Sequence, residues 1–328
     1  MAFANPNYSD IMATTIESRT RKIADNVTKN NAILAKLSTK GRIKPFSGGY
    51  QILQELSFAE NSNAGYYSGY DILPVGIADV ISAAQYNIKQ AACPVIISGL
   101  EMLQNAGRER MIDLMDSRLS VAESTMANLI SGGLYANGTG YGGKEIDGLD
   151  AAVPVNPAVG TYGGIDRSTA IGTFWRSQIS DQTATNGLDP TKIQGYWNAL
   201  WAKTVRGTNR PDLIMCDSTV WAVYMASLQA LQRFAQAETG ALGFPTLKFM
   251  DADVILDGGI GGFCPAGTAF FLDTDYLFYR PHSARNMVPL APNKRYATNQ
   301  DAEVQILAWA GNLTTSGAQF QGRYDANG

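Results

Sequence analysis

The chain has 328 residues, which is enough for two domains or for one elaborated domain with a sizeable core. Hydrophobic residues make up 45% of the chain and charged residues only 17%, and a surface with so few charges is typical of a protein that meets other proteins. The net charge of −3 excludes a polycation that coats nucleic acid along its whole length.

Basic residues are concentrated at the start of the chain. Residues 1–45 contain eight Lys or Arg against three acids, whereas the remainder is acidic. The favoured interpretation is a solvated helix face. The alternative is a surface that screens nucleic-acid phosphates, for which Lys22, Lys29 and Lys36 are the test residues.

The cysteines Cys93, Cys216 and Cys264 are far apart and form no C-x-x-C pair. We interpret them as reduced thiols of an intracellular protein. The first ten residues lack the basic start and apolar run of a signal peptide, and no stretch approaches the ~18 apolar residues of a membrane span. No membrane partner is expected.

The first part of the chain predicts a helix followed by a long hairpin. Apolar residues recur at helical spacing in a mostly polar segment over 10–37. Residues 50–58 alternate as in a strand, 61–70 are rich in turn formers and tyrosine, and 71–90 contain the returning strand. A two-stranded hairpin is only marginally stable in water, so it needs a surface to lie on, its own or a neighbour's.

The clearest helix in the sequence runs from about Ala106 to about Tyr135, after a short strand and helix start at 93–102. Its apolar residues step by three and four, and it would be about 40 Å long at 1.5 Å per residue. Residues 150–190 favour loops and short strands.

Helices and strands alternate in the following region as in a compact α/β domain. The predicted elements are a helix at 189–207, a strand at 211–217, a helix at 218–234, strands at 247–259 and 268–282, and paired strands within 302–324.

The stretch 136–149 contains Gly138, Gly140 and Gly143 with the spacing of a dinucleotide-binding turn, followed by Lys144. That turn requires a strand before the glycines and a helix after them, whereas here a long helix precedes them. A phosphate loop requires Ser or Thr after the lysine, and Glu145 follows instead. The C-terminus of a helix also repels phosphate. The spacing is therefore a coincidence of a glycine-rich turn.

Residues for catalysis are scarce. His282 is the only histidine, and a surface or packing role is favoured over a nucleophile–base pair. An acidic metal site is the remaining, less favoured option, with two expected strand-face sets: Asp251, Asp253 and Asp257, and Asp273 and Asp275. The sequence thus predicts no catalytic, cofactor-binding or metal-binding residue and no enzyme.

The order of these elements resembles the major capsid proteins of tailed bacteriophages with the Hong Kong 97-type shell fold. The resemblance extends over nearly the whole chain, in order, through these runs: "TTIESRTRKIADNVTKNNAILAKL", "KGRIKPFSGGYQILQEL", "YSGYDILPV", "ISGLEMLQNAG", "GGIDRST", "VRGTNRPDLI", "DGGIGGFCPA", "FLDTDYLFYRPH" and "ATNQDAEVQILAWAGNL".

The resemblance implies an α+β fold with four parts. These are an N-terminal arm at 1–37, an extended β-hairpin loop at 38–92, a peripheral domain with a long spine helix at 93–147 and 285–328, and an axial α/β domain at 148–284. It implies that the extended loop reaches over an adjacent subunit, and it makes the glycine-rich loop 258–267 a candidate contact at the capsomer axis. It also places the turn 136–149 between the spine helix and the axial domain, where bulky β-branched replacements of Gly140 or Gly143 are expected to impair assembly or expansion.

The implied function is structural. Hexameric and pentameric capsomers would form the icosahedral head around double-stranded DNA, with portal, scaffolding and possibly decoration proteins as partners, in a virion assembled in the bacterial host cytoplasm. A gene-transfer particle or an encapsulin-like compartment is the alternative. Some relatives crosslink the shell through a lysine in the extended loop, but residues 61–70 contain none, so no such crosslink is expected.

Overall fold

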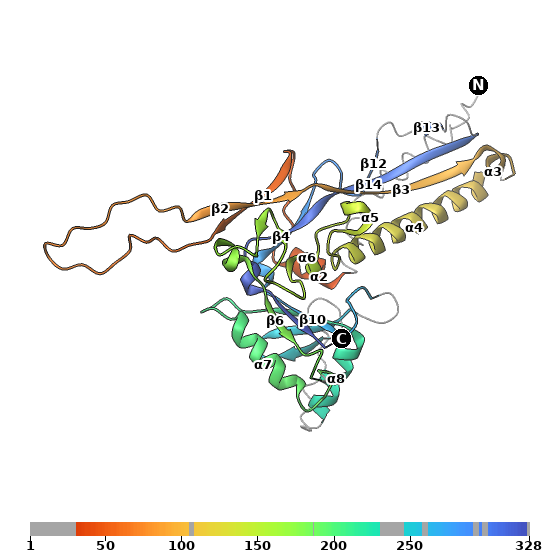
Figure 1. The fold of residues 1–328 in the computed structure, drawn as a ribbon. Helices are drawn as coiled ribbons and strands as arrows, with labels where there is room; N and C mark the ends of the chain where they lie inside the picture. Colours follow the sequence, from red (N-terminus) through yellow and green to blue (C-terminus); the bar gives the residue numbers. More distant parts are fainter. Residues whose placement is uncertain are drawn as a thin grey trace.

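The structure of the chain is a computed structural model, and it contains two main sheets, one long helix and a projecting loop (Figure 1). Residues 1–30, the larger part of the predicted helix 10–37, lie outside the described residues. The structure describes residues 31–104, 108–185, 187–229, 246–257, 262–290, 295–296 and 301–326.

The first described helix is α2, Ala32–Thr39. Asn31 caps it, because its side chain accepts hydrogen bonds from the backbone N–H groups of Ile33 and Leu34 at 3.0 and 3.2 Å. Its apolar residues are buried in the main core, which fixes this short helix against the body of the protein.

The predicted hairpin is present but shorter than expected. β1, Gln51–Ser57, pairs antiparallel with β2, Ile81–Asn87, and the pairing stops at Ser57 and Ile81. Residues 58–80 form no strand and project to one side of the molecule (Figure 1). Pro74 offers no N–H group to a ladder, and the many turn formers around it favour an open loop over a continued ribbon. We call this segment the loop 58–80.

A five-stranded sheet follows, built around the longest strand, β14, Ala302–Thr315. β14 pairs antiparallel along ten residues with β3, Lys89–Ser98. The other partners of β14, all antiparallel, are β11 (Leu277–Pro281), β12 (Val288–Pro289) and β13 (Arg295–Tyr296).

The long helix predicted at Ala106–Tyr135 is confirmed as α4, Arg108–Gly133, preceded by α3, Gly99–Gln104. α4 runs beside β3 and β14 and contacts β3 (Figure 1). Its buried residues keep the spacing of three and four that the sequence shows: Leu119, Ala122, Met126 and Ile130.

A connecting segment leads from α4 to the second sheet. It contains α5 (Gly140–Gly143), α6 (Leu149–Ala152), the two-residue strands β4 (Thr161–Tyr162) and β5 (Ile165–Asp166), and the 3₁₀ helix η1 (Ile171–Trp175). The buried Arg167 donates hydrogen bonds to the carbonyls of Ala151 and Ala152 at 3.1 and 2.6 Å. Its positive charge therefore lies at the C-terminal end of α6, where the helix dipole favours it.

The second sheet has six strands in the order β6-β15-β10-β7-β9-β8. Their bounds are β6 Gln178–Asp181, β7 Leu213–Cys216, β8 Thr246–Phe249, β9 Ala252–Leu256, β10 Thr268–Leu272 and β15 Gly322–Asp325. α7, Ile193–Thr204, and α8, Ser218–Gln229, pack on one face and share a core with it. The other face joins the main core, which also contains α2 and the end of α4.

An aromatic cluster fills the core between the six-stranded sheet and its two helices. The fully buried Trp197 stacks on Tyr224 with ring centroids 4.5 Å apart. Phe249 and Phe271 meet Trp197 edge to face at 5.3 and 5.2 Å. Such stacked and edge-to-face pairs add to the large apolar area that each ring buries. We call these four residues the Trp197 cluster.

Two predicted single strands are each broken in the structure. The run 247–259 is the hairpin β8–β9, whose turn contains Met250 with a φ of 52°. Glycine or asparagine normally marks such a turn, and neither is present, so the sequence carried no signal for it. The run 268–282 is divided at Asp273, whose side chain caps the 3₁₀ helix η2, Thr274–Tyr276. β10 and β11 consequently belong to different sheets.

The prediction of strands paired with each other within 302–324 is also wrong. β14 pairs in the five-stranded sheet, whereas β15 pairs with β10 and β6 in the other sheet, after the 3₁₀ helix η3, Ala318–Phe320. β15, at the end of the chain, therefore lies in the same sheet as strands of the segment 148–284, the predicted axial domain. β11, which belongs to that segment by sequence, lies instead in the sheet formed mainly by the segments 93–147 and 285–328, the predicted peripheral domain. These pairings are long-range, and local residue patterns do not specify them.

Among the described helices, none combines the length and the apolar character needed to cross a membrane.

Candidate assembly surfaces

The most exposed apolar side chains of the described residues gather on the loop 58–80. Tyr66, Tyr70 and Ile77 are completely exposed, and Ile72 and Val75 nearly so. Large apolar side chains scattered singly on a surface need no explanation, but a contiguous run of them marks an interaction site. The loop 58–80 therefore has the composition of an interface that this chain alone does not cover.

Few contacts hold the loop 58–80. Asn63 donates to the carbonyl of Gly76 at 2.6 Å, and the backbone of Ser68 donates to Asp71 at 2.8 Å, both within the loop. At the base of the loop, the exposed side chains of Glu60 and Arg206 form an ion pair at 3.6 Å, and the ring of Phe58 meets that of Phe174 with centroids 5.8 Å apart. The loop contains three acids and no Lys or Arg. It is thus an acidic, apolar projection with little support from its own chain.

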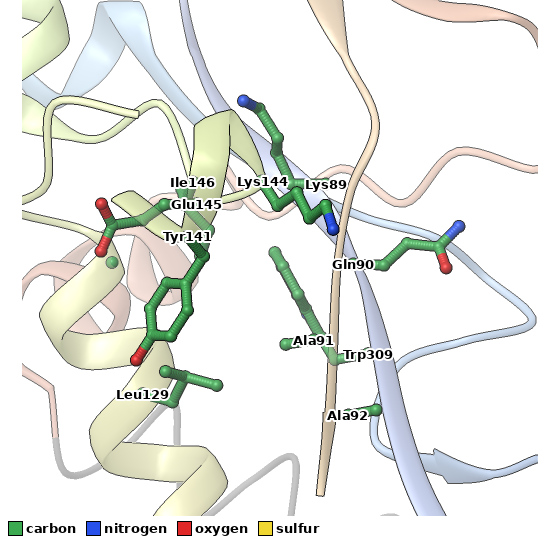
Figure 2. Close-up of a pocket in the computed structure, with 11 residues that line it drawn as sticks. Lys89, Gln90, Ala91, Ala92, Leu129, Tyr141, Lys144, Glu145, Ile146 and Trp309 are labelled. Carbon is green, nitrogen blue, oxygen red and sulfur yellow. The ribbon is translucent and has the colours of Figure 1, made fainter. Parts of the chain in front are cut away.

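A cavity of about 400 Å³ opens where the end of α4, the start of β3 and the 141–146 turn meet (Figure 2). Apolar groups and the ring of Trp309 make much of its wall, while two lysines and a glutamate supply the charges. The lining residues are Lys89, Gln90, Ala91, Ala92, Leu129, Gly133, Tyr141, Lys144, Glu145, Ile146 and Trp309.

The two lysines of this cavity differ in the contacts that their charged ends make. Lys89 is almost buried, and its Nζ donates to the carbonyl of Gly143 at 2.8 Å and lies 3.3 Å from Asp147. Lys144 is exposed and forms no ion pair with any residue that the structure describes. The charge of Lys144 is therefore available to a partner, whereas that of Lys89 is used to hold the turn.

The glycine motif of the sequence forms the turn that borders the cavity. α5 is a single distorted turn, with φ of 53° at Tyr141, 69° at Gly142 and 80° at Gly143. No long helix follows the motif, so its glycines do not form the dinucleotide-binding arrangement. Any β-branched residue at Gly143 would be strained by the positive φ, which supports the predicted sensitivity of that position.

Gly148 is a tightly enclosed glycine that the sequence does not single out. A Cβ atom there would collide with the backbone carbonyls of Gly133 and Leu134, at the end of α4. Leu149 donates its N–H group to the carbonyl of Leu134 at 2.7 Å, so the chain returns directly onto the helix end. Only a glycine allows this close approach of two backbone segments.

The predicted acidic residues do not converge on one site. Asp251 lies in the β8–β9 turn and pairs with Arg210 at 2.9 Å, and Asp257 accepts a hydrogen bond from the buried Tyr135. Burial raises the pKa of Asp257. Within the described part of the chain, no group of three or more His, Cys, Asp or Glu side chains is placed to hold a metal ion.

His282 and the cysteines occupy packing positions. The Nδ1 atom of His282 accepts from the backbone of Ala284 at 3.1 Å, and Phe46 meets its ring edge to face at 4.9 Å. Cys216 and Cys264 are buried, and burial raises the pKa of both thiols. A thiol with a raised pKa is a poor nucleophile at neutral pH.

Three basic residues in or just after α2 pair with three aspartates around the six-stranded sheet. The pairs are Lys36–Asp253 (2.8 Å), Lys36–Asp212 (3.8 Å), Lys40–Asp212 (3.1 Å), Lys40–Asp275 (3.2 Å) and Arg42–Asp275 (3.0 Å). We call these six residues the α2 ion-pair cluster. Lys36, a test residue for phosphate screening, is thus engaged with protein carboxylates, while Lys22 and Lys29 lie outside the described residues.

The pKa values of two neighbouring aspartates, one in this cluster and one beside it, are shifted in opposite directions. Burial raises the pKa of Asp275, but its bonds to Arg42 and Lys40 outweigh burial, so the pKa of Asp275 is lowered. Asp273 is 2% exposed, and burial raises its pKa to about 6. Asp273 and Asp275 are only two residues apart, yet the surroundings of Asp275 stabilise its charged form and those of Asp273 destabilise it.

Comparison with solved structures identifies the architecture. A chain from the capsid asymmetric unit of cyanophage A-1(L) superposes with a TM-score of 0.62 at 17% sequence identity, covering 87% of this chain and 90% of that chain. The chain has the Hong Kong 97-type capsid fold. The α+β fold class expected from the sequence is confirmed.

The same fold relates this chain to two other kinds of shell. A chain from the capsid of a native GTA particle has a TM-score of 0.58 at 12% identity, covering 90% of each chain. A chain of an encapsulin complex from Synechococcus elongatus has a TM-score of 0.52 at 8% identity, covering 89% of this chain and 87% of that chain. No protein-family model matches the chain, and no curated protein matches it in sequence.

Proposed function

We propose that this chain is the structural subunit of a closed protein shell, the major capsid protein of a tailed bacteriophage head. In this proposal, hexameric and pentameric capsomers of the chain form an icosahedral shell. The five-stranded sheet with α4 is the peripheral domain, and the six-stranded sheet with α7 and α8 is the axial domain. The fold that the chain shares with phage capsid chains supports the proposal.

The observation that carries the proposal is the loop 58–80. It exposes tyrosine, isoleucine and valine side chains that its own chain leaves uncovered. Covering such side chains with another copy removes their apolar surface from water, which favours association by roughly 25 cal/mol for each Å² covered. Repeated by symmetry, contacts of this kind add up to a stable container even when each is weak.

The contents and partners of the shell follow from the same proposal. Double-stranded DNA would fill the head through non-specific contacts, and portal, scaffolding and decoration proteins would complete a virion assembled in the host cytoplasm. The described basic residues near the start of the chain, including Lys36 and Lys40, already pair with aspartates. Phosphate screening would therefore rest on Lys22 and Lys29 rather than on Lys36.

A shell with another cargo is the second candidate, because a GTA particle capsid and an encapsulin share the fold. The cargo distinguishes these candidates, so nucleic acid extracted from purified particles identifies a phage head or gene-transfer particle, and enclosed protein identifies an encapsulin-like compartment. An acidic metal-dependent enzyme is disfavoured, because Asp251, Asp253 and Asp275 are engaged in ion pairs.

Electron microscopy of the purified protein tests the proposal. We expect closed shells or hexameric capsomers, and we expect a variant with Tyr66, Tyr67 and Tyr70 replaced by Ser to lose them. A control variant with Lys203, an exposed residue of α7, replaced by Ala should assemble normally. A wild-type protein that stays a monodisperse dimer under all assembly conditions would contradict the proposal.

The composition of the loop 58–80 also predicts that the shell lacks one kind of covalent crosslink. Residues 61–70 contain no lysine, so the shell should have no lysine–asparagine crosslink through this segment. Mature particles should then dissociate to single chains on denaturing gels, and ladders of covalent oligomers would contradict this expectation.

A further inference from the structure

We propose that Lys89 and Asn312 of the same chain join through an isopeptide bond, with Asp147 carrying the protons of the reaction. The bond links the start of β3 to β14 inside one subunit. It goes beyond the proposed function, because nothing in a shell requires a covalent bond within the subunit. It also differs from the crosslink that some relatives form through a lysine of the extended loop, which joins separate subunits.

Strand pairing brings the two residues together, although they are far apart in the sequence. The ladder between β3 and β14 ends at the pair Lys89–Gly311, and Asn312 is the next residue of β14. Lys89 is 9% exposed and Asn312 is completely buried. Polar side chains in such surroundings require polar partners, so the identity of those partners decides what the two side chains can do.

Asp147 is the partner that the two side chains share. Its Oδ1 atom lies 3.3 Å from the Nζ atom of Lys89, and its Oδ2 atom accepts a hydrogen bond from Nδ2 of Asn312 at 2.7 Å. One carboxylate therefore contacts both an amine and the nitrogen that an amide would lose. A carboxylate in this place can take protons from the first group and pass them to the second.

The side-chain carbonyl of Asn312 is arranged to accept negative charge. Its Oδ1 atom accepts hydrogen bonds from the backbone N–H groups of Asp147 and Leu313 at 3.0 and 2.9 Å. Nδ2 also donates to the carbonyl of Asn87 at 2.9 Å, which fixes the plane of the amide. Attack on Cγ places negative charge on Oδ1, and two N–H donors that already point at this atom stabilise it.

The reaction balances without an oxidant or another reactant. Asp147 accepts the two protons that the ammonium group of Lys89 loses, and the nitrogen of Lys89 attacks Cγ of Asn312. The bond between Nζ and Cγ forms, the bond between Cγ and Nδ2 breaks, and Nδ2 leaves as ammonium with the protons that Asp147 passes on. Burial excludes the water that would compete for Cγ.

The amine has to move before it reacts. In the structure, Nζ of Lys89 donates to the carbonyl of Gly143 at 2.8 Å. It must turn from this carbonyl toward Asn312 while it stays beside Asp147. The long, flexible side chain of lysine permits this movement, and the shared carboxylate keeps the two reacting groups close together.

Mass spectrometry of the purified, denatured subunit tests the bond. We expect the wild-type chain to weigh less than its sequence by one molecule of ammonia, and protease digestion to release a branched peptide that contains Lys89 and Asn312. The variants Lys89→Met and Asn312→Ala should have the full mass. A wild-type chain of full mass, or a loss of ammonia without this branched peptide, would overturn the proposal.

A second variant tests the role of Asp147. Asp147→Asn keeps the size of the side chain but removes the proton carrier, so it should slow bond formation at least about a hundredfold, measured by mass after cell-free synthesis. Glu145→Gln is the matched control, because Glu145 accepts from the backbone of Gly140 at 3.2 Å and should leave the rate unchanged. Bond formation in Asp147→Asn at the wild-type rate would show that Asp147 carries no protons.

These tests use the isolated subunit, so their outcomes are separate from those for the proposed function. A shell whose subunits lack the bond refutes this inference alone. A bonded subunit that forms no shell refutes the proposed function alone. Because the bond is internal, particles that contain it still dissociate to single chains on denaturing gels.

Discussion

The Trp197 cluster and the loop 58–80 contain similar residue types in opposite surroundings. Trp197, Tyr224 and Phe271 are buried among one another between the six-stranded sheet and its helices. The tyrosines of the loop, Tyr66 and Tyr70, are fully exposed. The chain thus completes one apolar core by itself and leaves a second apolar surface uncovered. Substitutions in the two regions should therefore separate folding of the subunit from assembly.

The largest effect on folding is expected at the centre of the cluster. Trp197→Ala should lower the free energy of unfolding by about 3–5 kcal/mol, because it removes a buried ring and leaves a cavity. Denaturant unfolding of the subunit measures this loss. Trp197→Phe should cost less, since it keeps the stacking on Tyr224, and equal losses for the two variants would contradict the packing argument.

The next largest effect is expected at Gly148. Gly148→Val should cost at least about 1–3 kcal/mol, because its side chain collides with backbone at the end of α4. Gly195→Ala is the matched control, since Gly195 lies in α7 with open space around its Cα and alanine favours a helix. Thermal unfolding of both variants checks the prediction, and a neutral Gly148→Val would refute the close approach.

A smaller effect depends on pH. Since the pKa of Asp273 is raised to about 6 in the folded protein, against about 3.9 when unfolded, its contribution to stability is present below pH 4 and is lost as the pH rises to about 6. Asp273→Asn should therefore be more stable than wild type by about 1–2 kcal/mol at pH 7.5 and equal to it near pH 4. Unfolding curves at both pH values test this, and a constant difference between the two proteins would contradict the shift.

The α2 ion-pair cluster should contribute less. Lys40→Met should lower the free energy of unfolding by about 1 kcal/mol at low salt, and by less in 1 M salt, because the pairs are only partly buried. Lys203→Met, which removes an exposed lysine that forms no ion pair with a described residue, should change little. A loss at Lys40 that does not depend on salt would show that the charges are not its cause.

The smallest effect on folding is expected in the loop 58–80. The triple replacement of Tyr66, Tyr67 and Tyr70 by Ser should change the free energy of unfolding of the isolated subunit by less than about 0.5 kcal/mol per site. The same variant should fail to assemble. Strong destabilisation of the isolated subunit would contradict this prediction, because it would show that the tyrosines pack on their own chain.

The sequence predicts those elements whose signal is local. The residues of α4 repeat at helical spacing over many turns, so the helix is found within two residues at each end. β1 is likewise predicted by its alternation. The β8–β9 turn is not predictable, because its Met250 adopts a positive φ, which is rare for methionine. No local pattern indicates that β15 pairs in the six-stranded sheet rather than with β14.

The assembly surfaces are predictable only in part. The turn-rich, tyrosine-rich segment 61–70 indicates the tip of a long hairpin that needs a surface to lie on, its own or a neighbour's. The cavity depends on residues far apart in the chain, including Leu129 and Trp309, and no spacing in the sequence joins them. The pairing of Lys36 with Asp253 is equally long-range, so the sequence indicates for Lys36 only a solvated helix face or, as the alternative, a phosphate-screening surface.

Hydroxyl-radical footprinting of free subunits and assembled particles tests the central claim most directly. The account predicts that oxidation of Tyr66, Tyr67 and Tyr70 falls severalfold on assembly, because another copy covers them, while the buried Tyr224 stays protected in both states. Equal oxidation of the three loop tyrosines in free subunits and in closed shells would contradict the account.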